Sequence, residues 1–167
     1  MIFEIKEYCV EEISQSDIND IVEIYNSNQK FLENHLKRRR VTNEWYEKEL
    51  KDMKDVVFKS CKIVDKKTRK IIGLLDFKIE KESYLSILMI HDTYKKQGVG
   101  RLIYKKFEEY LLSKGVCSIR IDVVINYDKD VIMFWSKLGY VENRNIELDW
   151  CGNKLSAIVI KKDIMNS

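Results

Sequence analysis

The 167-residue sequence contains no proline, four cysteines and only two histidines. Without proline, its turns depend on Gly, Asn, Asp and Lys. No apolar run reaches the length of about 18 residues that a transmembrane helix requires, so we expect no membrane association. The N-terminal residues alternate apolar and charged side chains and lack the apolar core of a signal peptide, which favours a cytoplasmic protein. The cysteines have no metal-ligand spacing, so we expect free thiols and no metal site.

Charge of one sign is not in large excess, because 30 basic residues face 27 acidic ones and leave a formal net charge of +3. So mild a balance does not indicate a nucleic-acid partner. Residues 37–40 form a basic run, Lys-Arg-Arg-Arg, but no aromatic side chains are interleaved with it. We therefore favour a solvated surface over a nucleic-acid patch. The length and an apolar content of 45% predict a single globular domain over residues 1–167.

Hydrophobic periodicity predicts alternating strands and helices along the chain. The strands are expected at 2–9, 56–64, 71–79, 85–90, 118–125, 140–150 and 155–162. The helices are expected near 18–25, 43–53, 98–113 and 129–138. The fold class is therefore α/β, with a mixed, mostly antiparallel central sheet of about seven strands, helices on both faces and the order β-α-α-β-β-β-α-β-α-β-β.

The most informative stretch is a glycine-containing turn between the apolar run 85–90 and the amphipathic helix that starts near Gly98. The first turn of a helix presents N–H groups without intrahelical partners and a positive dipole end, which suits an anion. Gly98 and Gly100 allow close approach to the main chain, and cationic side chains flank them. The pattern predicts a site for a diphosphate-bearing ligand, although a plain strand–loop–helix connection has the same composition. Neither a P-loop nor a complete G-x-G-x-x-G is present.

The wider segment 88–101 resembles the cofactor signature of the GCN5-related N-acetyltransferase (GNAT) superfamily. In that signature an apolar strand leads into [Q/R]-x-x-G-x-[G/A] at the start of a helix. The resemblance implies that the loop amides hold the pyrophosphate of acetyl-coenzyme A, while strand main-chain groups pair with its pantetheine arm. Lys95 stands where Gln or Arg is usual, and Asp92 replaces a common Pro. The implied cofactor-binding residues here are Leu88, Met89, Ile90, Lys95, Lys96, Gln97, Gly98, Val99, Gly100 and Arg101.

A later family motif, N-x-x-A-x-x-x-Y followed by Gly-Phe, matches the stretch that ends in Gly139-Tyr140. Asp128 then stands at the Asn position and Trp135 at the Tyr position, and the resemblance implies that both lie at the cofactor. In many members that tyrosine protonates the coenzyme A thiolate, but an indole N–H does not release its proton near neutral pH. Tyr127 or Tyr140 could replace it, or the thiolate could leave unprotonated. Packing against the sheet or the cofactor is the favoured role of Trp135.

Acyl transfer to an amine requires a neutral nucleophile and a polarised carbonyl. By analogy with the family, the backbone N–H of Ile90 would polarise the thioester. We predict Asp122 as the general base, because it matches a strand position where some relatives place a catalytic glutamate. A surface carboxylate, or one paired with an arginine, is an equally good interpretation of Asp122. Asp76 and Glu82 are the reserve candidates.

The resemblance implies an acetyl-coenzyme A-dependent N-acetyltransferase that acts on a primary amine of a small molecule or of a protein. A small acceptor is favoured, because nothing suggests a peptide-docking extension. The alternatives are a non-catalytic acyl-coenzyme A sensor and, more remotely, a nucleic-acid-binding domain. The family often forms homodimers. Candidate acceptor-pocket residues are Phe31, Glu33, His35 and Trp45.

Overall fold

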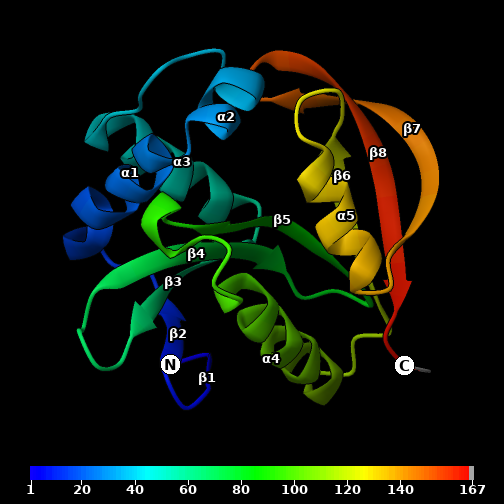
Figure 1. Ribbon diagram of the computed structural model, residues 1–167, viewed down its shortest axis with the longest axis horizontal. Helices are drawn as coiled ribbons and strands as arrows, with labels where there is room; N and C mark the ends of the chain where they lie inside the picture. The colour runs from blue at the N-terminus through cyan, green and yellow to red at the C-terminus, as the bar shows by residue number, and fades with distance from the viewer. Residues whose placement is uncertain (166–167) are drawn as a thin grey trace.

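The computed structural model describes residues 1–165, which contain an eight-stranded sheet (Figure 1). The strands follow the order β1-β2-β3-β4-β5-β6-β8-β7, and only the β5–β6 pair is parallel. The mixed, mostly antiparallel sheet is confirmed, with eight strands in place of about seven. Their bounds are β1 Phe3–Glu4, β2 Tyr8–Glu12, β3 Lys59–Asp65, β4 Ile71–Lys78, β5 Glu82–Ile90, β6 Ser118–Val124, β7 Val141–Trp150 and β8 Asn153–Asp163.

The additional strand comes from the N-terminal segment, where the single strand expected over 2–9 is wrong. The Ile5 N–H donates to the Tyr8 carbonyl at 2.9 Å and closes a turn, so that β1 pairs with β2 as a hairpin. A second boundary also differs from the prediction. Val56 and Val57 are strand formers by propensity, yet Val57 has φ +61° and is 78% exposed, and β3 begins only at Lys59.

Four longer helices lie where the periodicity predicts them, with caps that explain their ends. Thr42 Oγ1 accepts from the Trp45 N–H at 3.3 Å at the start of α3, and Gly115 takes φ +77° just after α4. Between α1 and α3 the chain forms a short helix and one π-helical turn, a region without regular periodicity in the sequence. The bounds are η1 Gln15–Asp17, α1 Ile18–Ser27, α2 Gln29–Phe31, η2 Leu32–Leu36, α3 Asn43–Asp55, η3 Asp92–Tyr94, α4 Val99–Ser113 and α5 Lys129–Lys137.

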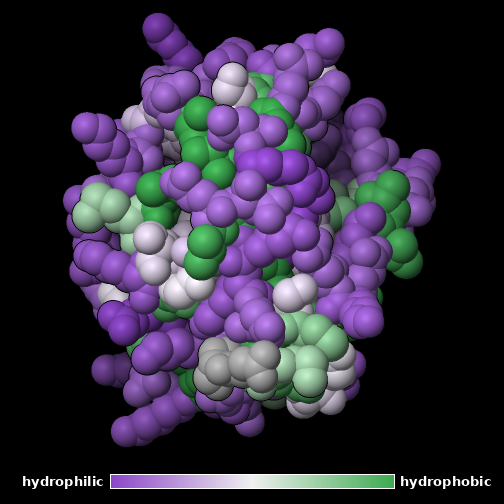
Figure 2. Space-filling view, turned by 90° about the vertical axis from the view of Figure 1, so that its right-hand side faces the viewer, coloured by the Kyte–Doolittle hydropathy of each residue, from purple (hydrophilic) through white to green (hydrophobic). Residues whose placement is uncertain are grey.

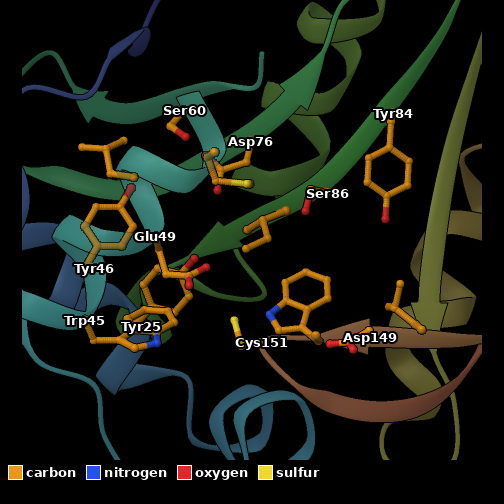
Figure 3. Close-up of a pocket in the computed structure, with 15 residues that line it drawn as sticks. Tyr25, Trp45, Tyr46, Glu49, Ser60, Asp76, Tyr84, Ser86, Asp149 and Cys151 are labelled. Atoms are coloured by element: carbon orange, nitrogen blue, oxygen red, sulfur yellow. The ribbon is translucent and has the colours of Figure 1, made fainter. Parts of the chain in front are cut away.

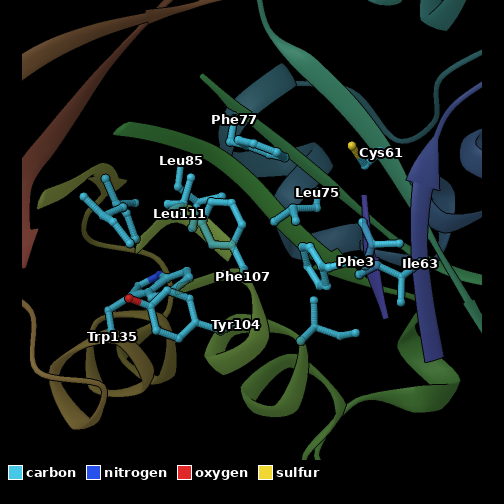
Figure 4. Close-up of a cluster of buried hydrophobic side chains, with 14 of the residues drawn as sticks. Phe3, Cys61, Ile63, Leu75, Phe77, Leu85, Tyr104, Phe107, Leu111 and Trp135 are labelled. Atoms are coloured by element: carbon cyan, nitrogen blue, oxygen red, sulfur yellow. The ribbon is translucent and has the colours of Figure 1, made fainter. Parts of the chain in front are cut away.

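Helices cover both faces of the sheet, and each covered face has its own hydrophobic core. On one face, Phe77 of β4 meets Phe107 of α4 with ring centroids 4.8 Å apart (Figure 4). On the other, Leu74 of β4 belongs to a cluster with Ile21 of α1 and Tyr46 of α3. Because side chains alternate along a strand, β4 anchors both cores. The site described below therefore lies on a rigid element.

The edge strand β7 is polar and mostly exposed, which protects the sheet edge from pairing with other chains. The side of the molecule that carries β7 and β8 is largely hydrophilic in Figure 2, with apolar side chains only in separate groups. No helix within residues 1–165 is long and apolar enough to cross a bilayer.

Candidate active site

Strands β5 and β6 separate in the middle of the sheet. They pair only from Glu82↔Ser118 to Tyr84↔Arg120, although β5 continues to Ile90 and β6 to Val124. Each strand keeps its partner on the other side, because β5 pairs with β4 as far as Ile90 and β6 pairs with β8 as far as Val124. The result is a gap between two strand edges that main-chain groups line.

The amides of Leu88 and Ile90 face this gap. The His91 N–H donates to the Ile72 carbonyl at 2.8 Å, so His91 is hydrogen-bonded to β4. In an antiparallel pair, hydrogen-bonded residues alternate with residues whose main-chain groups point to the opposite side. Leu88 and Ile90 therefore direct their N–H groups away from β4. That Ile90 presents its N–H to a ligand stays a prediction.

A buried asparagine, Asn28, fixes the end of β5. Asn28 Nδ2 donates to the Ile90 carbonyl at 3.1 Å and to the Ile24 carbonyl at 2.8 Å. Asn28 thereby links the end of α1 to the edge of the gap. No sequence signal separates this role from that of a turn residue.

A β-bulge at Ser86 reshapes β5 next to the gap. Asp76 pairs with Ile87 and Phe77 with Leu85, which leaves Ser86 as the extra residue. Because of this insertion, Ser86 and Ile87 both lie along the same pocket. Bulges are frequent beside active sites, where they redirect side chains.

The gap opens toward the N-terminus of α4, where the predicted anion site lies. Gly98 has φ +80°, and the first intrahelical bond there runs from Leu102 N–H to the Gly98 carbonyl at 3.1 Å. Within residues 1–165, the amides of residues 96–101 donate to no backbone carbonyl. Val99 is buried in the core, so it offers only its main chain. Lys96 and Arg101 are exposed beside these amides.

The remaining predicted loop residues have partners of their own. Lys95 Nζ lies 3.3 Å from an Asp92 carboxylate oxygen, and Gln97 Nε2 donates to the Thr93 carbonyl at 2.9 Å. Both contacts shape the turn between β5 and α4. A Cβ on Gly100 would lie 3.7 Å from Phe134 Cζ and 3.9 Å from Ile90 Cγ1, so Gly100 faces α5 and the gap edge.

Asp122 sits at the point where the strands separate, and both of its oxygens are engaged. Arg120 donates to them at 2.8 and 3.0 Å, and Tyr84 Oη donates at 3.3 Å. The Asp122 side chain is 5% exposed. The structure thus shows that Asp122 pairs with an arginine, which was one of the two interpretations of this residue in the sequence. The role of Asp122 as a base remains a prediction.

Trp135 lies in the hydrophobic core. Its ring centroid is 5.4 Å from those of Tyr104 and Tyr140, and Tyr104 Oη donates to Tyr140 Oη at 3.0 Å. Burial raises the pKa of Tyr140 well above its ordinary value. The aromatic ring that reaches toward Gly100 and Ile90 belongs instead to the neighbouring Phe134, which the sequence interpretation did not single out.

Two further candidates near the start of α5 have structural contacts. Asp128 Oδ1 accepts from the Asp130 N–H at 3.0 Å as the N-cap of α5, and another Asp128 oxygen lies 3.5 Å from Lys30 Nζ. Burial raises the pKa of Tyr127 to about 12, and its ring packs edge-on against His35. The contacts of Asp128 with Lys30 and of Tyr127 with His35 join the segment before α5 to α2 and η2.

A pocket of about 190 Å³ lies against β5 on the sheet face that α1 and α3 cover (Figure 3). Tyr84, Ser86 and Ile87 of β5 form one of its sides, so it adjoins the strand whose main chain edges the gap. Besides Tyr84, four aromatic side chains surround it, namely Tyr25, Trp45, Tyr46 and Trp150. Three carboxyl groups also line it, those of Glu49 on α3, Asp76 on β4 and Asp149 on β7.

Asp76 is the buried carboxyl group of this pocket. It is 2% exposed, and its Oδ1 has no hydrogen-bond partner within residues 1–165. Burial raises the pKa of Asp76 from 3.8 to about 7, with an opposing effect of the Ser60 hydroxyl and a smaller contribution from Glu49. A carboxyl group that titrates near neutral pH in a pocket has the properties of a general base.

Of the four acceptor-pocket candidates, only Trp45 lines this pocket. His35 is buried against Phe31, with ring centroids 4.0 Å apart, and its ring lies edge-to-face with Trp150 at 5.3 Å. Burial lowers the pKa of His35 to about 4. Glu33 is exposed, as are all four residues of the basic run 37–40.

Known proteins resemble this chain in sequence and in fold. The sequence matches the Acetyltransferase (GNAT) family over residues 18–140, and the chain belongs to that family. It is 21% identical over 147 residues to an uncharacterised N-acetyltransferase of Methanocaldococcus jannaschii. That match covers 86% of this chain but only 65% of the relative, so the chain spans less than two thirds of that protein.

Solved structures share the fold at low sequence identity. A spermidine N-acetyltransferase from Vibrio cholerae, crystallised with CoA and spermine, superposes with a TM-score of 0.74 at 13% identity over 95% of this chain and 96% of that one. A ribosomal-protein-S5-alanine acetyltransferase from Vibrio fischeri gives a TM-score of 0.71 at 19% identity, over 96% and 95% of the two chains. The resemblance seen in the sequence is thereby confirmed at the level of family and fold.

Proposed function

We propose that residues 1–167 form a single catalytic domain that transfers the acetyl group of acetyl-coenzyme A to a primary amine. The observation that carries this proposal is the position of the gap between β5 and β6. One end of the gap leads to the unpaired amides at the start of α4, and β5 forms a wall of the acidic, aromatic pocket. Donor and acceptor sites thus share one strand.

Main-chain groups would hold most of the donor. The N–H groups of Leu88 and Ile90 suit the pantetheine arm and the thioester oxygen, because they are fixed donors on a strand edge. The amides of residues 97–101 suit the pyrophosphate, and Lys96 and Arg101 add positive charge beside them. Phe134 and Gly100 would border the arm where the gap meets α4. Lys95, Met89 and Val99 would contribute indirectly, by holding the loop and the strand in the conformation that binds the donor.

The amine would enter through the pocket and attack the thioester carbonyl carbon directly. We propose Asp76 as the base that takes the proton from the attacking nitrogen, because its pKa lies near neutrality and one oxygen is unpartnered. Asp122 is less suited, since Arg120 and Tyr84 already occupy both of its oxygens. Cleavage of the C–S bond releases a thiolate, and a thiol pKa of about 8.5 allows it to leave without a protein acid.

A sensor that only binds acyl-coenzyme A is the alternative, and the pocket argues against it, because a sensor needs no acceptor site. The test is free-thiol release from acetyl-coenzyme A with a mixture of primary amines, followed by mass spectrometry of the amines. We expect an acetylated amine in stoichiometric amount with the thiol. Tight binding of acetyl-coenzyme A without turnover of any amine, including peptide α-amines, would favour the sensor.

A further inference from the structure

The acceptor pocket carries negative charge that no protein cation neutralises. Glu49, Asp76 and Asp149 line it, whereas none of its lining residues is Lys, Arg or His. Within residues 1–165, none of the three carboxylates forms an ion pair. This occurs in a chain with an excess of basic residues. Asp149 is exposed and accepts a hydrogen bond from the Gly152 N–H at 2.9 Å, and Glu49 is half-buried. Because carboxylates that share one pocket without a cation disfavour one another's ionisation, the arrangement points to a cationic ligand.

Two polar atoms in the pocket are unpartnered and buried. Asp76 Oδ1 and Tyr46 Oη make no hydrogen bond within the described part of the chain, and both residues are at most 2% exposed. Buried polar groups are nearly always hydrogen-bonded in folded proteins. Both groups line the pocket, with the Asp76 carboxyl toward its interior in Figure 3, so a ligand nitrogen is the partner that they lack.

The aromatic side chains favour an organic cation. Tyr25 and Trp45 meet edge to face at 5.3 Å, and Trp150 lines the pocket from β7. Ring faces attract ammonium groups and cover the methylene groups between them. The carboxylates are not grouped to hold a metal ion in residues 1–165. A volume of about 190 Å³ suits a short aliphatic chain, since a water molecule occupies ~30 Å³.

The number of carboxylates exceeds what one amine requires. The attacking nitrogen must be neutral, and Asp76 is placed to take its proton. Glu49 and Asp149 then remain for a second positive centre. We propose that the acceptor is a small aliphatic diamine or oligoamine, with one amine attacking beside Asp76 and another ammonium held by Glu49, Asp149 and the tryptophans. This inference rests on the proposed N-acetyltransferase function.

A panel of acceptors that differ in charge and length distinguishes a diamine acetyltransferase from an enzyme that acetylates primary amines in general. Thiol release is measured at saturating acetyl-coenzyme A with butane-1,4-diamine, spermidine, butylamine, 4-aminobutanoate and a tripeptide with a free α-amine. We expect kcat/KM for the diamine or spermidine to exceed that for butylamine by about 10-fold or more, as the loss of a charged hydrogen bond predicts. We expect 4-aminobutanoate, with its negative end, to be the poorest aliphatic acceptor.

Variants of α3 test whether the pocket carboxylates cause the preference. Glu49→Gln should lower kcat/KM for the diamine by about 10-fold and change butylamine turnover by less than about 2-fold. Glu47→Gln is the matched control, because Glu47 lies on the same helix, is exposed and does not line the pocket. The Glu47→Gln substitution should leave kcat/KM unchanged for both the diamine and butylamine.

The outcomes separate the two levels of the proposal. If butylamine, 4-aminobutanoate or the tripeptide is acetylated as well as the diamine, the diamine inference is overturned while the N-acetyltransferase function stands. An equal effect of Glu49→Gln on diamine and butylamine would also overturn it. If no amine in the panel releases thiol although acetyl-coenzyme A binds, the proposed function itself fails.

Discussion

Tyr84 Oη donates a hydrogen bond of 3.3 Å to Asp122 Oδ2 at the point where β5 and β6 separate. The last backbone pair of the two strands joins Tyr84 to Arg120, and Arg120 in turn donates to both oxygens of Asp122. This cluster closes one end of the gap in which we place the donor. The Asp122 carboxylate in this cluster is paired with the Arg120 guanidinium, whereas the neighbouring pocket has carboxylates and no lining cation.

The two candidate bases should respond differently to removal of their charge. Asp76→Asn should lower kcat/KM by about 100-fold or more, because a general base typically contributes that much. Asp122→Asn should chiefly lower stability, by about 2 kcal/mol, because it leaves Arg120 without its partner. Steady-state kinetics combined with thermal unfolding measures both. Loss of activity in a stably folded Asp122→Asn protein, with Asp76→Asn active, would reverse the assignment.

The activity of the wild-type protein should rise with pH through about 7, the pKa of Asp76. Below that pH the carboxyl group is protonated and does not accept a proton from the amine. In Asp76→Asn this limb should be absent from the profile of kcat/KM. A profile of the variant that still falls below pH 7 would show that another group is the base. The amine's own ionisation near pH 10 adds a separate limb in both proteins.

Asp76→Asn should also change the pH dependence of stability. Its pKa is higher folded than unfolded, so between pH 4 and 7 the folded state binds more protons and the free energy of unfolding falls as pH rises. The substitution removes this effect, and the variant should gain stability relative to the wild type up to pH 7, by on the order of 3 kcal/mol.

Urea unfolding from pH 4 to 8 measures this difference. The pKa of His35 is lowered, so His35 contributes in the opposite sense between pH 4 and 6.5, but equally in both proteins. The difference between variant and wild type therefore isolates Asp76. A difference that is constant with pH would mean that Asp76 is ionised throughout this range.

Two glycines at opposite ends of α4 allow a controlled test of the anion site. Gly98 and Gly115 have φ +80° and +77°, and a Cβ at either meets nothing within 4 Å. A side chain at either position should therefore cost a similar 1–2 kcal/mol or so of backbone strain. Gly98→Glu also places a carboxylate beside the free amides, so it should weaken acetyl-coenzyme A binding at least ~10-fold in calorimetry, whereas Gly115→Glu should not. Equal affinities would remove the anion site from that turn.

Trp135 should behave as a core residue and not as part of the chemistry. Trp135→Phe should lower stability by about 1–3 kcal/mol, because it leaves space among Tyr104, Phe134 and Tyr140. The kcat of the folded protein should stay within about 3-fold. Thermal unfolding and kinetics at saturating substrates give the two quantities. A collapse of kcat with unchanged stability would contradict the packing role.

The sequence predicted those parts of the protein that local patterns encode. The strand–turn–helix around Gly98 and the helix that starts at Lys129 depend on neighbouring residues, and both are found where expected. The strand predicted at Val57 is wrong, because this residue adopts a positive φ in the turn that follows α3 despite its high strand propensity. The bulge at Ser86 gives no local signal, since it is visible only in the register with β4.

The pocket was the part that the sequence could not reveal. Glu49, Asp76 and Asp149 are far apart along the chain, and only the fold brings α3, β4 and the end of β7 to the same pocket. From the sequence, Asp76 is only a reserve candidate for the base. Its burial and its unpartnered oxygen distinguish it, and neither is a property of the sequence.

The most direct test of the donor site is a crystal structure of the protein with acetyl-coenzyme A. The pyrophosphate should accept hydrogen bonds from the amides of residues 97–101, and the pantetheine arm should lie between β5 and β6 with its thioester beside the pocket of Asp76. A gap left empty, with the pyrophosphate bound elsewhere on the molecule, would contradict the account.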